Sequence, residues 1–146
     1  DPCCGTPLFD AIGKAVKKIK RDTKDIDDAA VLVTIITDGY ENSSKEWTGP
    51  MVKKLIDECK EEGWMFSFIG AGEDVVKVAT TISISNTVVW EQTSEGTAEM
   101  FENENQARNR FYDKMAAPCC GAPMSLEERK AMKRRLAEEY YDEDKK

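Results

Sequence analysis

The sequence predicts an α/β protein with an open, Rossmann-like parallel sheet that carries helices on both faces. Short apolar runs alternate with longer amphipathic stretches, and this order is typical of parallel strands joined by right-handed helical crossovers. The first apolar run, residues 30–37, carries no charge and shows no alternation of polar and apolar positions. Such a run fits a strand that is buried on both faces.

The predicted sheet is small for its class. Three runs of strand length are present, whereas sheets usually have about five or six strands. The run at residues 31–37 has the composition of a central strand, yet this chain supplies neighbours for only one of its sides. We therefore expect part of the sheet to be missing from this sequence.

The first helix and strand have clear boundaries. Thr6-Pro7 is a helix start signal in which the threonine is the expected N-cap. Apolar positions over residues 8–19 follow the spacing of an amphipathic helix, which we expect to end near Arg21. After a charged connector, the first strand runs to a turn at Asp38.

The middle of the chain alternates helix and strand twice. Thr48 is the expected N-cap of a second helix that ends at Gly63, a residue suited to a C-cap. Residues 64–69 predict the second strand, residues 73–80 a short helix and residues 87–90 the third strand.

A long helix is predicted after the third strand. Thr93-Ser94 provides its cap, and Phe101 and Tyr112 belong to its apolar positions. The middle of this helix, residues 102–110, is strongly polar, so we expect it to be solvated.

The last part of the chain has a different character. Ser125 with Glu128 matches a capping box, which predicts a helix in the tail. We divide the chain into a partial domain, residues 1–116, and a charged tail, residues 117–146, whose last five residues are expected to be disordered.

The composition indicates one soluble domain. The chain has 146 residues, of which 34% are charged, and a formal net charge of -7. This acidic balance argues against nucleic-acid binding, which requires a basic surface. No apolar run approaches the ~20 residues of a membrane span and no signal peptide is present, so we expect a cytoplasmic protein without a membrane partner. The first residue is Asp1 rather than Met, which suggests a fragment or a processed product.

Four of the five cysteines occur as adjacent pairs, within the repeat Pro-Cys-Cys-Gly-x-Pro at residues 2–7 and 118–123. Three interpretations stay open: a zinc ion bound by four thiolates, a disulfide between the two loops, and ordinary free cysteines in a reducing compartment. Structural zinc sites usually separate paired cysteines by about two to four residues, so free cysteines are favoured.

The sequence argues against the common catalytic arrangements. It contains no histidine, which excludes Ser-His-Asp and Cys-His catalysis within this chain. Gly70-Ala71-Gly72 is placed like a dinucleotide-binding loop, but Val75 occupies the position of the third glycine. A tight strand-to-helix turn explains these glycines better. We expect no catalytic residues, and the alternative is a nucleotide-binding or hydrolytic α/β enzyme.

Asp38 is the first candidate for a functional residue. It follows the first strand, and open parallel sheets bind ligands at the carboxyl ends of their strands. Asp-Gly is also common in turns, where the carboxylate accepts local hydrogen bonds. Both interpretations stay open at this point.

Three stretches together resemble the von Willebrand factor type A (vWA) domain, and the likeness is closest to its bacterial cytosolic versions. They are the helix start Thr6-Pro7-Leu8-Phe9-Asp10-Ala11-Ile12-Gly13, the strand at 31–39 with its terminal Thr-Asp-Gly, and residues 64–70. The resemblance extends from about Gly5 to Met115, and the order of elements agrees throughout. It implies that this chain is the carboxyl-terminal half to two-thirds of such a domain, lacking the first three strands.

The resemblance also implies a divalent-cation site, the metal ion-dependent adhesion site of the family, which usually holds Mg²⁺. Its ligands are an Asp-x-Ser-x-Ser motif, a threonine in a second loop and an aspartate after the fourth strand. Thr6 matches the threonine and Asp38 matches that aspartate, whereas the Asp-x-Ser-x-Ser motif has no counterpart here. Because Mg²⁺ prefers near-octahedral oxygen coordination, these two residues alone would hold Mg²⁺ or Mn²⁺ weakly.

The leading functional hypothesis is a vWA-like module that binds a protein partner. In the family, an acidic residue of the partner completes the coordination of the cation. Asp38, Thr6 and residues 39–47 form the expected recognition edge, and Trp47 is the one tryptophan placed to meet a partner. A further alternative is that a second chain supplies the missing strands, which would make this chain one half of an assembly.

Overall fold

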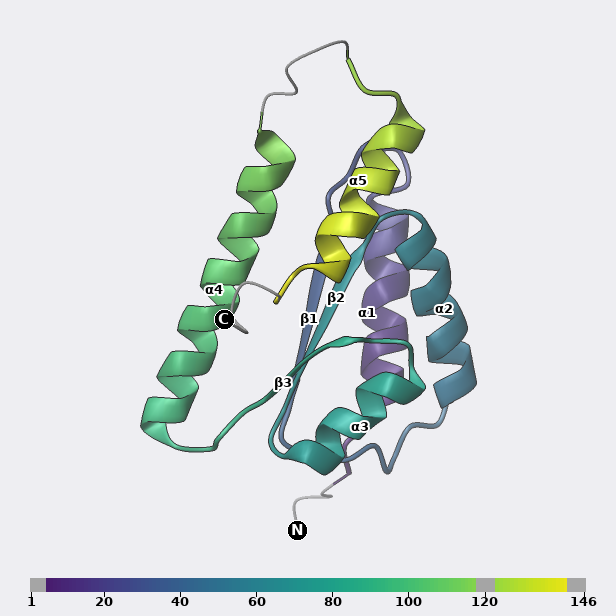
Figure 1. Cartoon of the computed structure of the whole chain (residues 1–146). Helices are drawn as coiled ribbons and strands as arrows, with labels where there is room; N and C mark the ends of the chain where they lie inside the picture. Colours follow the sequence, from purple (N-terminus) through teal and green to yellow (C-terminus); the bar gives the residue numbers. More distant parts are fainter. Residues whose placement is uncertain (1–4, 118–122, 142–146) are drawn as a thin grey trace.

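The computed structural model describes residues 5–117 and 123–141. It confirms the predicted fold class, an α/β arrangement with an open parallel sheet (Figure 1). Helices and strands follow one another in this order: α1 Leu8–Asp22, β1 Leu32–Thr37, α2 Gly49–Glu61, β2 Met65–Gly70, α3 Glu73–Thr81, β3 Asn86–Val89, α4 Ser94–Ala116 and α5 Leu126–Glu138.

The sheet has the strand order β1-β2-β3, and both pairs are parallel. Leu32 lies opposite Met65, and Ser67 lies opposite Asn86, so β3 begins later along β2 than β1 does. Within the described ranges β1 pairs only with β2. β1, whose composition is typical of a central strand, therefore lies at an edge of this sheet.

Helices cover both faces of the sheet (Figure 1). The first three helices pack on one face, and the buried side chains there include Ile12, Val16, Ile35, Val52, Ile56, Phe66, Phe68 and Ala79. The last two helices pack on the other face, around Met65, Ala107, Phe111, Leu136, Tyr140 and Tyr141. The predicted layering of helix, sheet and helix is thus present.

Several predicted helix boundaries are confirmed. The Thr48 side chain accepts a hydrogen bond from the Met51 amide at the start of α2. Gly63, just beyond α2, has a φ of 87°, a conformation that glycine adopts without strain. The Ser125–Glu128 capping box is present at the start of α5.

The expected N-cap of α1 is wrong by one residue. α1 begins at Leu8, its N-cap is Pro7, and no side chain caps it. Thr6 instead offers its backbone oxygen to the amides of Leu8 and Asn42, which lie 2.9 and 3.3 Å away. The threonine hydroxyl is therefore not used in capping.

The expectation for α4 is also wrong in its middle and at two apolar positions. Glu104 and Ala107 are buried, whereas the Phe101 and Tyr112 side chains are 49% and 43% exposed. Glu104 tolerates burial because Thr34, Tyr140 and Tyr141 all donate hydrogen bonds to its carboxylate. A charge pattern read along one helix did not reveal donors that come from other elements.

The first strand is less buried than its composition indicates. Thr37 is buried, but Ile36 is 43% exposed on the face that α4 and α5 cover. This exposure follows from the place of β1 at the edge. None of the helices within residues 5–117 and 123–141 has the length and apolar character needed to cross a membrane.

Candidate functional site

The turn that carries Asp38 lies against Thr6 at the carboxyl end of β1. Asp38 is exposed in the turn that follows Thr37, whose hydroxyl accepts a hydrogen bond from the Gly39 amide at 3.2 Å. A Cβ on Gly39 would lie 2.7 Å from the Thr6 hydroxyl oxygen, so the hydroxyl lies directly against this turn. Only a residue without a side chain permits that approach. The two residues singled out in the sequence are thus brought together.

Both polar groups have unused bonding capacity. Within residues 5–117 and 123–141, the Asp38 carboxylate and the Thr6 hydroxyl form no hydrogen bond and no ion pair. Asp38 therefore does not act as the acceptor of turn hydrogen bonds that its Asp-Gly sequence suggested as one interpretation. A ligand approaching this end of the sheet would meet a carboxylate and a hydroxyl that bond to none of the described residues.

The loop after Asp38 is held by Glu41. Its carboxylate accepts hydrogen bonds from the amides of Phe9, Ser44 and Ser43 at 2.7, 2.8 and 3.0 Å, and from the Ser44 hydroxyl at 2.7 Å. Partial burial alone would raise the pKa of Glu41, but the hydrogen bonds from Phe9 and Ser44 outweigh it and hold the pKa below its ordinary value. Glu41 thus stays ionised at neutral pH and ties the loop to the start of α1.

Asp10 holds the same loop from the other side. The amides of Lys45, Glu46 and Trp47 donate to its carboxylate at 2.9, 3.0 and 2.8 Å. These hydrogen bonds, the one from Lys45 above all, lower the pKa of Asp10. Sequence reasoning missed both anchoring carboxylates. Asp10 stood within the stretch that resembles the vWA domain, but nothing local shows which loop it binds.

The Trp47 ring packs against α1. A Cβ on Gly13 would lie 2.1 Å from the Trp47 indole, so the ring covers the glycine of α1 directly. Lys17 places its ammonium 4.9 Å from the ring centroid. The ring is partly buried against the core and holds the end of the loop, while contact of its exposed part with a partner stays a prediction.

The described residues do not form a complete site for a resident Mg²⁺ ion. No group of three or more His, Cys, Asp or Glu side chains within residues 5–117 and 123–141 is arranged to hold a metal. Ser44 is already engaged, because its hydroxyl bonds to both Glu41 and the Asp10 amide. Asp38 and Thr6 supply two oxygen donors, which is too few for tight octahedral coordination.

Two other sequence features can be placed. Gly72 precedes α3 with a φ of 118°, and its amide bonds the Gly70 carbonyl, so residues 70–72 form the expected tight turn. Cys59 is buried, and burial raises the pKa of its thiol to about 11, which makes it unreactive. Both Cys-Cys pairs lie outside the described residues, and so does the end of the tail that we expected to be disordered.

A scan against protein-family models, a search of curated proteins and a search of solved structures each found no match.

Proposed function

We propose that this chain is part of a vWA-like protein-binding module whose recognition edge is the carboxyl end of β1. The observation that carries the proposal is the Thr6 hydroxyl lying against the turn that holds Asp38, where neither the hydroxyl nor the Asp38 carboxylate bonds to a residue within 5–117 and 123–141. The resemblance of the sequence to the vWA family points to the same two residues. A binding role also suits an edge at which the neighbouring carboxylates of Asp10 and Glu41 are already engaged in holding the loop.

The rigidity of the loop supports the proposal. Glu41 and Asp10 together accept six backbone hydrogen bonds, three each, from α1 and from the loop itself. A loop fixed in this way loses little conformational entropy when a partner binds. We therefore infer that Asp10 and Glu41 hold the loop that presents Asp38 and do not serve in catalysis.

A divalent cation belongs to the proposal as a shared ligand. Asp38 and Thr6 are the donors that this chain would contribute to Mg²⁺ or Mn²⁺, and the remaining donors would come from outside the described residues. An acidic side chain of the partner is the natural candidate, since carboxylates are preferred ligands of both ions. We expect weak metal binding by the chain alone.

Isothermal titration with Mg²⁺ and Mn²⁺ tests this proposal. The wild type should bind at least one of them with a dissociation constant of about 1 mM or below. Asp38→Ala should abolish the signal, and Thr6→Val, which keeps the side-chain shape, should weaken it. Asp27→Asn is the matched control, because it removes a carboxylate that lies before β1. The proposal fails if no metal binds, or if Asp38→Ala binds as the wild type does.

A second candidate function is that of one half of an assembly, with the sheet extended beyond β1 by another chain. The observation in its favour is the outer edge of β1, which pairs with no strand within residues 5–117 and 123–141 and carries no charged residue. Soluble proteins usually protect such edges with charge, proline or a covering element. This candidate is compatible with the first, since an added strand would pair along the edge of β1, whereas the Asp38 turn lies beyond the end of β1.

A further inference from the structure

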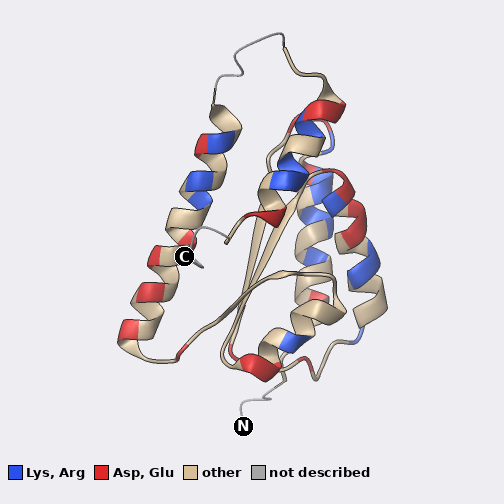
Figure 2. Cartoon of the chain, in the orientation of Figure 1, with Lys and Arg blue, Asp and Glu red and all other residues tan. Residues whose placement is uncertain are grey.

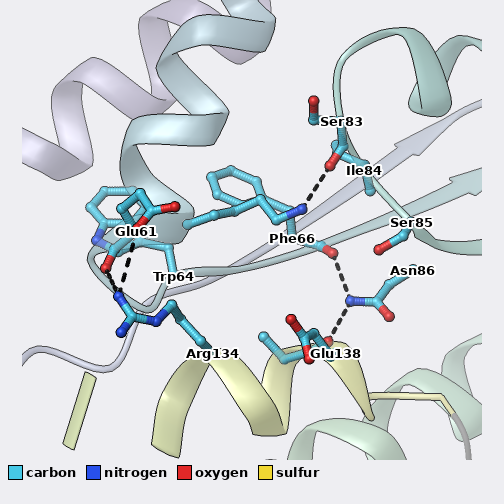
Figure 3. Close-up of a pocket in the computed structure, with 11 residues that line it drawn as sticks. Glu61, Trp64, Phe66, Ser83, Ile84, Ser85, Asn86, Arg134 and Glu138 are labelled. Atoms are coloured by element: carbon cyan, nitrogen blue, oxygen red, sulfur yellow. Dashed lines mark hydrogen bonds and ion pairs between the residues drawn. The ribbon is translucent and has the colours of Figure 1, made fainter. Parts of the chain in front are cut away.

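The two outer edges of the sheet are protected to different degrees. β3 has only four residues, and short edge strands resist further pairing. Where β3 does not reach, the Asn86 side-chain nitrogen donates to the carbonyls of Phe66 in β2 and Ala137 in α5, at 3.2 and 2.8 Å (Figure 3). The outer edge of β1, by contrast, is six residues long and pairs with no strand within residues 5–117 and 123–141.

The backbone of β1 shows which residues present hydrogen-bonding groups at this edge. The carbonyls of Val31 and Thr37 accept hydrogen bonds from amides of β2 and of the turn after it, at 3.0 and 3.1 Å, so both face β2. The pairing between the two strands is one-to-one throughout. Because successive residues of a strand turn their amide and carbonyl to opposite sides, Leu32, Thr34 and Ile36 direct theirs to the outer edge.

These three residues form a self-complementary edge. In an antiparallel pair centred on Thr34, this residue would face Thr34 of a second copy, and Leu32 would face Ile36. Each facing pair can exchange two main-chain hydrogen bonds, which gives about six in total. β1 contains no charged residue and no proline that would oppose the pairing. Such a pair has twofold symmetry and closes on itself, so neither copy keeps an unpaired β1 edge.

The helix α4 is placed symmetrically about the same residue. It crosses Thr34 between Glu104 and Arg108, whose carboxylate and guanidinium lie 2.6 and 3.1 Å from the Thr34 hydroxyl. Phe101 and Tyr112 flank this crossing and are 49% and 43% exposed. They are about three helical turns apart and so lie on one side of α4. A twofold axis at Thr34 would therefore bring Phe101 of one copy level with Tyr112 of the other.

The charges of α4 also suit an antiparallel pair. Acidic residues dominate its first half and basic residues its second half (Figure 2). Arg110 and Lys114 lie on the side of α4 that contacts α5, and Phe101 and Tyr112 lie on the opposite side. Two antiparallel copies of α4 would set the acidic half of each opposite the basic half of the other, and their helix dipoles would be opposed as well. A parallel pair would align like charges.

We propose that a second copy of this chain pairs with the outer edge of β1, antiparallel and centred on Thr34. The product is a continuous sheet of six strands, three from each copy, with the two α4 helices side by side on one face. This inference rests on the second candidate function, one half of an assembly, and names the other half. Pairing would bury the exposed side chains of Ile36, Phe101 and Tyr112.

Amide hydrogen exchange combined with light scattering tests this pairing. At high concentration the wild type should have twice the mass of one chain, and the amides of Leu32, Thr34 and Ile36 should exchange slowly. On dilution the mass should halve and these amides should lose protection, while those of Val33 and Ile35, which face β2, keep it.

Two results would overturn the inference, and they differ in what they say about the candidate function. A wild type that stays monomeric, with rapid exchange at Leu32, Thr34 and Ile36, would exclude the second copy but not another chain. A monomer in which these amides are already protected would exclude strand addition altogether, because the chain itself would then cover the edge.

Variants of Ile36 test the pairing of the strands. Ile36→Pro removes an amide that faces away from β2, and proline is tolerated on an edge strand at such a position. The variant should therefore fold as a monomer, and its dimer dissociation constant should rise about tenfold or more, since two symmetry-related hydrogen bonds are lost. Ile36→Val keeps the amide and should dimerise as the wild type does. A folded Ile36→Pro protein that dimerises like the wild type would overturn the inference.

A variant of α4 tests the pairing of the helices without altering a strand. Phe101→Glu should weaken dimerisation, because it replaces an aromatic side chain at the interface by a charge. Leu126→Glu is the matched control, since Leu126 is equally exposed but lies on α5. Equal dimerisation of Phe101→Glu and the wild type would overturn the inference even if Ile36→Pro failed to fold.

Discussion

At the scale of single residues, Asp10 and Glu41 explain why a nine-residue polar loop has a defined shape. Asp10 lies on α1 and accepts amides of the loop, while Glu41 lies in the loop and accepts an amide at the start of α1. Hydrogen bonds to an ionised carboxylate are stronger than those between neutral groups. The two residues thus fasten helix and loop reciprocally.

This arrangement predicts how the loop responds to acid. The folded-state pKa values of Asp10 and Glu41 are both lowered, so their stabilisation is fully present above the ordinary values of 3.8 and 4.5. It is lost as the pH falls below those values and through the folded-state pKa. NMR signals of the Ser44 and Lys45 amides, followed from neutral pH to about pH 2, should therefore titrate below 4.5 and 3.8 respectively. Midpoints at or above the ordinary values would contradict the assigned hydrogen bonds.

Gly13 provides a second prediction at this scale. Replacing a glycine inside a helix by alanine normally stabilises a protein by about 0.5–1 kcal/mol. Here the added Cβ would collide with the Trp47 ring, so Gly13→Ala should instead destabilise by about 1–3 kcal/mol in urea unfolding. Gly49→Ala is the control, since its Cβ would make an ordinary contact 3.4 Å from Phe9. A stabilised Gly13→Ala protein would show that Trp47 does not cover α1.

The end of the first strand singled out Asp38 and the family resemblance added Thr6, and the structure places the Thr6 hydroxyl against the turn that carries Asp38. It did not supply Asp10 and Glu41, because each bonds to residues more than 30 positions away and no periodic pattern records such pairs. The packing of Trp47 on α1 was not predicted for a similar reason. Its partner is a glycine on another element, and a glycine gives no sign in the sequence that a ring will cover it.

At the scale of elements, α5 is fastened to the sheet largely by polar contacts. Lys133 is 2% exposed, donates to the Ala29 carbonyl at 3.0 Å and forms an ion pair with Asp28. At the other end, Tyr140 and Tyr141 donate to Glu104 at 3.0 and 2.6 Å. These contacts compensate for the few apolar positions of the helix.

Tyr141→Phe tests how much this anchoring contributes. Burial first, and then Glu104, raise the pKa of Tyr141 well above its ordinary value, so the phenol stays protonated and donates at every physiological pH. Removing the hydroxyl leaves one oxygen of a buried carboxylate without this donor and should cost about 1–3 kcal/mol in urea unfolding. Tyr112→Phe alters an exposed phenol and should change stability by less than about 0.5 kcal/mol. Equal effects of both changes would mean that the Glu104 contacts do not hold the tail.

Element types and their order could be predicted from the sequence, because caps, glycines and apolar runs are local signals. The buried face of α4 could not. Glu104 reads as a solvated residue, and its burial depends on donors from β1 and from the end of the tail. In Figure 2, acidic residues dominate the first half of α4 and basic residues its second half, a division that the helix period alone does not explain.

At the scale of the whole molecule, the main structural liability is the edge of β1 that no other strand of the described part of the chain covers. β1 carries no charge, and Ile36 adds an exposed apolar side chain beside the free edge. Such an edge favours pairing with another strand. The composition of β1, typical of a central strand, is consistent with a sheet that continues beyond it.

Ile36→Lys should reduce any self-association through this edge. A lysine on an edge strand opposes pairing, because its charge would be buried in the extended sheet. Light scattering over a range of protein concentrations should show a larger mass for the wild type than for the variant. Met51→Lys is the control, since it adds the same charge at a similarly exposed position on α2. A wild type that is a stable monomer at all concentrations would exclude strand addition by a second copy.

The most direct test of the recognition edge is to locate where a cation binds. Mn²⁺ broadens the NMR signals of nearby amides, and at low occupancy it should first broaden those of Thr6 and Gly39 at the end of β1. Asp38→Asn should remove this effect, and Asp27→Asn should preserve it. Broadening that centres on the acidic half of α4, or that persists unchanged in Asp38→Asn, would contradict the account.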